Sequence, residues 1–369
     1  MNALERAWWR RAEGPLVRAL LAPLVLPELA FRAGVALRGL GYDRGLLPAE
    51  RAAAPVVSIG NVAVGGAGKT PAAIAVAERL RARGRRVAVL SRGYGARRSD
   101  ARVVSHGAGL VVPAADAGDE PALLAGRLAG VAVLCGPRRV TLARLATGAG
   151  ADALVLDDGF QHRALARDLD VVVLDAANPF GNGRLLPRGP NREPRGALSR
   201  AGLIWLSRVD QARPEALAPL RAMAREATGA APVESCHAPV EVFDGALARA
   251  HGKEALRGAR VLLLSGIARP EGFRRTVEGL GAAVARERAF PDHHVFTPAE
   301  LDEALAAAAA AGCDAVVLTE KDAVRLAPER AADPRLRVVR VEARIVAGED
   351  VLEAALGRAL AAWPGGETP

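Results

Sequence analysis

Short, unbroken runs of hydrophobic residues recur along the first half of the chain, and segments of helix length separate them. The runs occupy residues 56–59, 87–90, 131–134, 153–156 and 171–174. A strand whose two faces are both buried has such a continuous run, whereas a strand with one exposed face alternates hydrophobic and polar positions. The pattern therefore predicts an α/β fold with a doubly wound, mostly parallel sheet that helices cover on both faces.

The second half of the chain repeats this pattern on a smaller scale. Strands are expected at 261–264, 283–288, 315–318 and 338–341, with helices that begin near Glu271, Pro298 and Asp350. Residues 226–239 are rich in Thr, Gly, Pro, Ser and Ala, which is typical of a linker. Because 369 residues suffice for two domains of ordinary size, we expect a core domain at 49–228 and a smaller α/β domain at 229–369.

The first 48 residues form a basic and amphipathic region. Two tryptophans and two arginines, at positions 8–11, precede an apolar segment at 16–30 that Arg18, Pro23, Pro27 and Glu28 interrupt. No run of eighteen uninterrupted apolar residues exists, which disfavours a membrane-spanning helix. The pattern fits a helix lying in a lipid interface, and it fits equally a helix packed on the body of the protein.

Composition and charge narrow the function only in part. Half of the residues are hydrophobic and a quarter are charged, which excludes a disordered chain. The net charge of +9 favours phosphates, nucleic acid or anionic membranes as partners without choosing among them. The three cysteines form no C-x-x-C pair, so neither a zinc site nor a disulfide framework is expected and a reducing cytoplasm is the natural compartment.

A glycine-rich segment, G-N-V-A-V-G-G-A-G-K-T-P at 60–71, links the first predicted strand to an alanine-rich helix at 71–83. This strand–loop–helix context predicts a phosphate-binding loop and an overall P-loop NTPase-like fold. Its main-chain donors would come from Gly65, Gly66, Ala67 and Gly68. Lys69 would reach the β- and γ-phosphates of ATP, and the Thr70 hydroxyl would bind Mg²⁺. The strict motif requires glycine at position 63, where this chain has alanine.

Candidate carboxylates lie at the ends of two predicted elements, after a strand and before a helix. Asp157 and Asp158 end the strand at 153–156, where a P-loop enzyme holds its metal ion, although Asp-Gly is also common in plain turns. Asp119 stands before a helix, either as its N-cap or as the general base for an acceptor hydroxyl. Glu120 is a further candidate for the metal ion or its waters.

Arginines, histidines and one lysine complete the set of candidates. Arg92 and Arg192 lie in loops after strands, where guanidinium groups suit phosphates but surface arginines are also common in this chain. His293 and His294 precede a helix, either to orient a carboxylate base or to pack locally. Lysine is rare here, and Lys321 belongs to a polar cluster at 319–322 that suits either a nucleotide contact or local ion pairing.

Seven motifs in register resemble the tetraacyldisaccharide 4'-kinase family. They are the loop at 60–71, S-R-G-Y-G, G-D-E-P, L-D-D-G-F-Q-H, N-P-F-G-N-G-R-L-L-P-R-G-P-N-R-E-P, F-P-D-H-H and L-T-E-K-D-A-V. The resemblance implies that ATP and Mg²⁺ are cofactors and that the 4' hydroxyl of a tetraacyldisaccharide 1-phosphate is phosphorylated to give lipid IVA. It also implies that residues 1–48 contact the membrane, that the protein is peripheral on the cytoplasmic face of the inner membrane, and that no nucleic acid is bound.

The same resemblance assigns roles to the candidate residues. It implies that Asp119 is the catalytic base, with His293 favoured over His294 as its partner. It makes Asp157 and Asp158 carboxylates of the metal or nucleotide site, and it makes Arg192 a phosphate contact. The family's loop has the form G-N-x-x-x-G-G-x-G-K-T-P, so alanine at position 63 does not count against the match. A smaller domain that closes over the nucleotide is implied as well.

One alternative is a nucleotide-switch ATPase of the G-G-x-G-K-T kind, which acts through a protein partner. Such proteins usually have lysine before the glycine pair, where this chain has Val64. A GTPase is disfavoured because the guanine-reading N/T-K-x-D string is absent. A soluble small-molecule kinase would leave the N-terminal tryptophans without a purpose.

Overall fold

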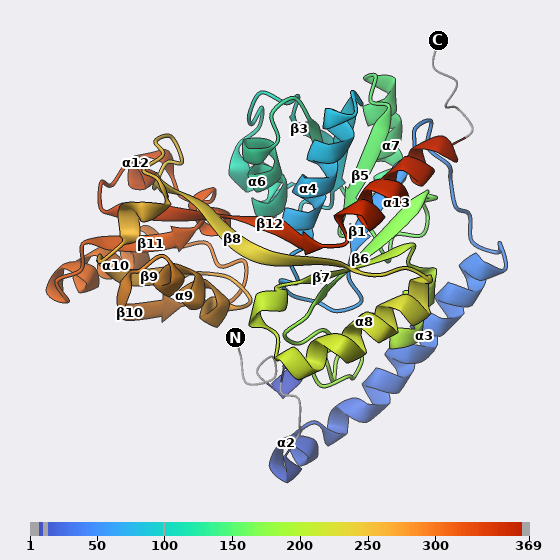
Figure 1. The fold of residues 1–369 in the computed structure, drawn as a ribbon, viewed down its shortest axis with the longest axis horizontal. Coiled ribbons are helices and arrows are strands. Elements are labelled where there is room, and N and C mark those ends of the chain that lie inside the picture. The colour runs from blue at the N-terminus through green and yellow to red at the C-terminus, as the bar shows by residue number, and fades with distance from the viewer. Residues whose placement is uncertain (1–6, 10–13, 99, 364–369) are drawn as a thin grey trace.

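The computed structural model describes residues 7–9, 14–98 and 100–363. Its named strands form one mixed sheet of twelve strands in the order β10-β9-β11-β12-β8-β7-β6-β1-β5-β2-β4-β3. Two lobes share this sheet, and Figure 1 shows the long strands β8 and β12 running from one lobe to the other. The predicted α/β class with a mostly parallel sheet is confirmed.

The core lobe contains the strands predicted from the first set of hydrophobic runs. They are β1 (Val56–Gly60), β2 (Val87–Ser91), β3 (Arg102–Ser105), β4 (Ala132–Cys135), β5 (Ala153–Asp157), β6 (Leu169–Asp175) and β7 (Leu203–Ser207). These strands pair in parallel except for β3, which lies antiparallel to β4 at the edge. Neighbouring residues of one strand enter cores on opposite faces of the sheet: Val155 packs with α4 (Lys69–Ala82) and α6 (Asp119–Arg127), whereas Leu154 packs with α7 (Arg139–Gly148).

The smaller lobe has three strands and short helices of its own. They are β9 (Arg260–Ser265), β10 (Ala283–Ala289), β11 (Ala315–Thr319), α9 (Pro270–Gly279), α10 (Pro298–Ala310), α11 (Glu320–Ala323) and α12 (Pro328–Ala331). α9 packs on one face of this part of the sheet and α10 on the other. The helices expected near Glu271 and Pro298 are confirmed.

The predicted linker at 226–239 is wrong. α8 (Pro214–Thr228) extends into this segment, and β8 (Val233–Asp244) begins within it. β8 pairs antiparallel with β12 (Leu336–Ala347) along most of its length. Pairing with β12 satisfies the backbone hydrogen bonds of β8. The polar, proline-containing sequence of this stretch has low strand propensity and so does not predict a strand. The connection between the lobes is therefore ordered sheet.

The last helix, α13 (Glu349–Ala361), returns to the core lobe. Leu352 and Leu356 are fully buried in the same cluster as Val57 of β1. Arg79 of α4 also binds Glu349, with 2.7 Å between Nη2 and Oε1. The boundary at residue 228 stays a prediction, but the packing places α13 with the core lobe.

The N-terminal region forms α2 (Pro15–Leu20), η1 (Ala22–Leu24) and α3 (Val25–Asp43), and Figure 1 shows α3 along the outer edge of the core lobe. Its exposed apolar side chains include Leu26 (76% exposed), Leu29, Leu37 (69%) and Leu40. By length and composition alone, the helical segment Val17–Asp43 is apolar enough to cross a membrane, although core helices and signal sequences pass the same test. Arg10 and Arg11, which the sequence analysis includes in the basic amphipathic region, lie outside the described residues.

Candidate active site

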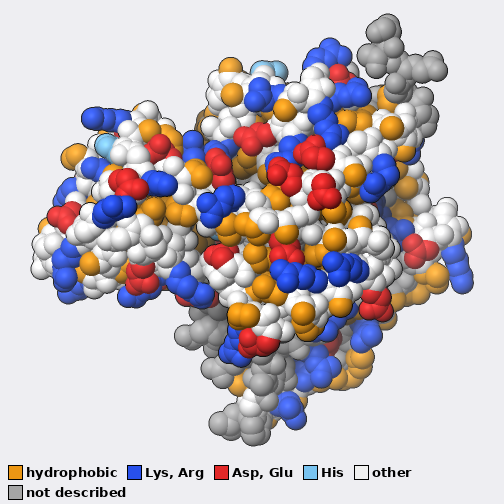
Figure 2. All heavy atoms as spheres, viewed as in Figure 1, with side chains coloured by type: hydrophobic (Ala, Val, Ile, Leu, Met, Phe, Trp, Pro, Cys, Tyr) orange, Lys and Arg blue, Asp and Glu red, His pale blue; other side chains and the backbone are white. Residues whose placement is uncertain are grey.

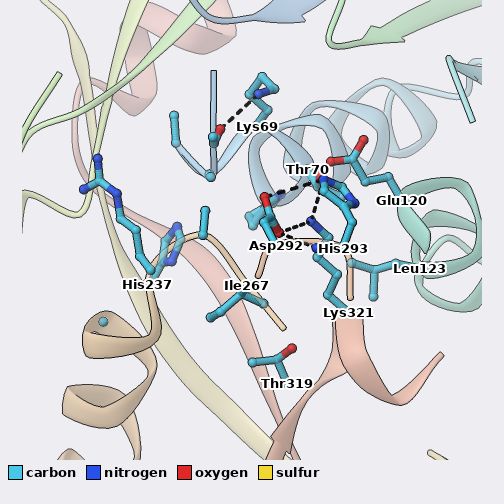
Figure 3. Close-up of a pocket in the computed structure, with 18 of the residues that line it drawn as sticks. Lys69, Thr70, Glu120, Leu123, His237, Ile267, Asp292, His293, Thr319 and Lys321 are labelled. Atoms are coloured by element: carbon cyan, nitrogen blue, oxygen red, sulfur yellow. Dashed lines mark hydrogen bonds and ion pairs between the residues drawn. The ribbon is translucent and has the colours of Figure 1, made fainter. Parts of the chain in front are cut away.

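A cavity of about 580 Å³ lies between the two lobes, and Figure 3 shows side chains from both lobes pointing into it. Its lining includes the phosphate-loop residues 64–70, with Glu120 and Asp158 from the core lobe and His293 and Lys321 from the smaller lobe. The structure thus brings together candidates that are more than 250 residues apart in the chain.

The glycine-rich segment forms the predicted loop between β1 and α4. Gly65 and Gly68 have φ of +89° and +87°, in the left-handed region that favours glycine. Gly68 is the N-cap of α4, so the helix begins at Lys69 with its free N–H groups at the cavity. Lys69 Nζ lies 3.4 Å from the Gly65 carbonyl oxygen and 3.5 Å from Asp158 Oδ1. Thr70 lines the cavity next to it.

The two carboxylates at the end of β5 differ in charge state. Burial opposes ionisation of Asp158, but Lys69 and Arg192 lower its pKa below the usual range, and Arg192 Nη1 lies 2.7 Å from Asp158 Oδ2. Burial, followed by the nearby charges of Glu120 and Asp158, raises the pKa of Asp157 to about 7. The Ser91 hydroxyl donates to Asp157 across 3.3 Å.

These oxygen atoms suit a magnesium ion. A carboxylate that burial and its acidic neighbours keep partly protonated gains from a divalent cation, because the cation compensates the buried negative charge and removes the like-charge repulsion. Among the described residues, no three His, Cys, Asp or Glu side chains form a metal-binding group by themselves. Mg²⁺ usually keeps several waters and binds through one or two carboxylates plus substrate phosphates, so this donor set fits it.

Asp119 is the centre of an ion-pair cluster made by both lobes. It is the first residue of α6, and the N-cap of this helix is Gly118, so the N-cap alternative for Asp119 is wrong. Its Oδ2 lies 2.8 Å from His293 Nδ1 and 3.5 Å from Lys321 Nζ, and it contacts Arg325. Burial opposes ionisation, but the His293 hydrogen bond and the charges of Lys321 and Arg325 lower the pKa of Asp119 below its usual range. The carboxylate is therefore ionised.

The structure separates the two neighbouring histidines. His293 has φ of +65°, which turns its ring toward Asp119, and the ring also lies 4.9 Å from that of Tyr94. His294 points the other way, with Nε2 2.9 Å from Glu300 Oε2 and its ring stacked on Phe290. The contact to Asp119 thus belongs to His293, and His294 packs locally.

Sequence reasoning did not find all the partners of Asp119. Arg325 carried no signal, because it is one of many arginines. Lys321 was flagged by the rarity of lysine, and the structure joins it to Asp119 and Asp292. Its neighbour Glu320 pairs with Arg127 of the core lobe and with Arg340 of β12, so its ion pairs are not the local ones that the sequence offered as an alternative.

The N-terminal tryptophans pack on the body of the protein, which is one of the two arrangements that the sequence allows. Trp8 and Trp9 both line the cavity. Trp8 Nε1 donates to the Pro187 carbonyl across 3.1 Å, and the Asn178 amide donates to the Trp9 carbonyl across 2.9 Å. The loop after β6 therefore fixes both residues, and this contact has no signature in the local sequence.

Comparison with known proteins supplies an independent result. The model of the family described as tetraacyldisaccharide-1-P 4'-kinase matches residues 17–361. A protein of Anaeromyxobacter sp. (strain Fw109-5), named tetraacyldisaccharide 4'-kinase, is 72% identical over 98% of this chain and 97% of its own length. A protein of the same name from Syntrophus aciditrophicus (strain SB) is 40% identical over 89% of this chain and 91% of its own length.

A solved structure resembles this fold across most of the chain. It is the "apo" form of LpxK from Aquifex aeolicus in complex with ATP, with a TM-score of 0.74 and 28% sequence identity. The similarity covers 92% of this chain and 99% of the other. The likeness therefore includes both lobes.

Proposed function

The chain belongs to the tetraacyldisaccharide-1-P 4'-kinase family, and we propose that it transfers the γ-phosphate of ATP to the 4' hydroxyl of a tetraacyldisaccharide 1-phosphate, giving lipid IVA. The observation that carries this proposal is the placement of the phosphate loop, with Lys69, in the same cavity as His293, the partner of Asp119. The phosphate loop and the histidine that contacts the candidate base thus line one cavity. A kinase needs this arrangement, and a switch ATPase that acts through a protein partner does not.

The phosphate loop is proposed to hold the ATP triphosphate. The main-chain N–H groups of 65–68 and the positive end of α4 attract phosphate oxygens, and Lys69 adds a full positive charge. Arg192 is proposed as a further phosphate contact, because its guanidinium lines the same cavity beside Asp158. Thr70, Glu120, Asp157 and Asp158 would hold Mg²⁺, which, when bound, neutralises charge on the transferring group.

Asp119 is proposed to accept the proton of the sugar hydroxyl, with His293 holding the carboxylate in place. The lowered pKa makes Asp119 a weak base, yet it also ensures that the carboxylate is ionised at neutral pH. Phosphoryl transfer through a loose transition state asks mainly for positioning and electrostatic stabilisation, so a weak base that is well placed is sufficient.

The exposed face of α3 is proposed to contact the cytoplasmic surface of the inner membrane. Arginines, including Arg32 and Arg38, lie on the same helix as the exposed leucines. A helix that lies in an anionic lipid interface has this combination of apolar and basic side chains. An acceptor with four acyl chains resides in a membrane, so the enzyme must work at that surface. Figure 2 shows basic side chains interspersed with acidic ones over the face that it draws, without the broad basic patch of a nucleic-acid-binding protein.

The direct test is incubation of the full chain with γ-labelled ATP and a lipid disaccharide monophosphate, with and without Mg²⁺. Label should move to the lipid, and Lys69→Ala should abolish the transfer. Lys253→Ala is the matched control, since Lys253 is an exposed lysine of the smaller lobe, and it should retain activity. ATP hydrolysis without labelled lipid would instead support the switch ATPase.

A further inference from the structure

Asp175, at the end of β6, binds two arginines from different lobes. Its side chain is only 2% exposed and lies 2.8 Å from Arg208 Nη2, at the end of β7. Arg269, in the loop between β9 and α9 of the smaller lobe, contacts the same carboxylate oxygen. Trp9 lies beneath the Arg269 guanidinium, whose carbon is 4.7 Å from the ring centre. We call these four residues the Asp175 cluster.

The Asp175 cluster touches the phosphate loop at two successive residues. Arg208 donates to the Gly66 carbonyl as well as binding Asp175. Trp9 lies against Gly65, since a Cβ at that glycine would come within 3.2 Å of Trp9 Cζ2. The cluster therefore supports the part of the loop that is closest to the smaller lobe.

Electrostatics explains why the parts of the Asp175 cluster depend on one another. The buried Asp175 carboxylate pairs with two guanidinium groups. Loss of either guanidinium changes the net charge of a site from which water is largely excluded, and so changes how strongly the other one is held. Arg269 also donates to the Asn178 carbonyl across 3.4 Å, and the Asn178 side chain in turn holds the Trp9 backbone. A shift of the smaller lobe that withdraws Arg269 thus removes the cover of Trp9 and one partner of Asp175 together.

We propose that Arg269 and Trp9 are positioning residues for the nucleotide. Together they hold the phosphate loop in its binding shape, and they do so only when the smaller lobe and the N-terminal segment are both in place. This inference rests on the proposed function, because it assumes that the loop binds ATP. Coupling free energies are reciprocal, so ATP bound at the loop stabilises the seating of Trp9 to the same degree. Neither side chain touches the Asp119 pair, and the chemical step itself does not depend on them.

The test compares Arg269→Met, Arg269→Lys, Trp9→Phe and Trp9→Ala in the full chain. Arg274→Met is the matched control, because Arg274 lies on α9 of the same lobe in exposed ion pairs with Glu278 and Glu287. Two quantities are measured: the KM for ATP against kcat, and the emission of Trp9 without nucleotide, obtained by subtracting the spectrum of the Trp9→Phe variant.

Arg269→Met and Trp9→Ala should each raise the KM for ATP about fivefold or more, the lower end of typical coupling between sites, with kcat changed less than about twofold. The double variant should do no worse than the more severe single one. Arg269→Met should also shift the Trp9 emission to longer wavelength, as the ring loses its cover. Trp9→Phe should bind ATP nearly as well as the wild type.

An unchanged KM for ATP in both Arg269 variants and in Trp9→Ala overturns the proposal, as does an unshifted Trp9 emission in Arg269→Met. If Arg269→Met does not fold, Arg269→Lys decides by the same two measurements, since lysine keeps the charge but not the planar fork. If the wild-type protein transfers no phosphate to the lipid, the proposed function is wrong. The emission measurement uses no nucleotide, so it tests the contact between Arg269 and Trp9 independently of that function.

Discussion

Asp119 Oδ2 and His293 Nδ1 lie 2.8 Å apart, although Asp119 belongs to the core lobe and His293 to the smaller lobe. The pair exists only when the lobes are together. Lys321 and Arg325, from the smaller lobe, hold the same carboxylate, so closure of the lobes both completes the candidate base and fixes its charge state. The contact between the lobes and the assembly of the candidate catalytic pair thus depend on the same packing.

Replacing Asp119 by alanine should lower kcat by about 10²-fold or more, the usual contribution of a positioned base, while the Kd for ATP changes little. The reason is that Asp119 contacts His293, Lys321 and Arg325 rather than the phosphate loop, so its proposed role concerns the acceptor hydroxyl. Labelled transfer to lipid and equilibrium ATP binding measure the two quantities. Asp116→Ala, three residues earlier in the preceding helix Ala114–Ala117, is the control, and an unaltered kcat in Asp119→Ala would refute the base assignment.

The adjacent histidines should respond in opposite ways. His293→Ala should reduce kcat strongly, because it removes the hydrogen bond that orients Asp119. His294→Ala should keep kcat within about threefold of the wild type while lowering the free energy of unfolding by about 1 kcal/mol, through loss of its stacking on Phe290. Kinetics and urea unfolding of both variants check this, and equal losses of kcat would contradict it.

His237 should make stability depend on pH. Burial and the neighbouring charge of Arg208 lower the pKa of His237 from 6.5 to about 3. Between these values the unfolded chain binds more protons than the folded one, so this contribution to stability is lost as pH falls from about 6.5 toward 3. Wild type should lose about 1.5 kcal/mol more than His237→Gln between pH 6.5 and 5.

Urea unfolding at the two pH values measures this difference for His237. The control is His106→Gln, at an exposed position after β3, which should show the same loss as the wild type. A wild-type protein and a His237→Gln variant with identical pH dependence would disprove the expected burial of a neutral imidazole.

The ion pair between Arg127 of α6 and Glu320 of α11 should stabilise the contact between the lobes. Arg127 Nη1 lies 2.8 Å from Glu320 Oε2, and their side chains are 7% and 8% exposed. Arg127→Met should lower the free energy of unfolding by about 2 kcal/mol, less than the 3–5 kcal/mol typical of a broken buried pair, since Arg340 still binds Glu320.

The denaturant midpoint measures that loss. The control is Arg330→Met, which breaks an exposed pair with Asp302 and should cost less than about 1 kcal/mol. An equal loss in the free energy of unfolding for the two substitutions would mean that the buried pair stabilises the contact between the lobes no more than an exposed pair does.

Local pattern was enough for most of the strands but not for β8. Runs such as 153–156 and 171–174 are apolar because both faces of the sheet are covered, and that requirement can be read one residue at a time. β8 contains Glu234, His237 and Pro239, and it is a strand because β12 pairs with it along the chain. Strand formation there depends on a partner about a hundred residues away, which local composition does not reveal.

Local sequence was sufficient to predict the phosphate loop, the carboxylates at the end of β5 and the family, because glycines, lysine and acidic residues at fixed spacing are required by the chemistry of a nucleotide site. The packing of the two lobes was needed to show which histidine meets Asp119, that Lys321 and Arg325 join it, and that Trp9 covers Gly65. These contacts join segments from different lobes. Their existence depends on how the lobes pack, which is a property of the whole sheet rather than of any short stretch of chain.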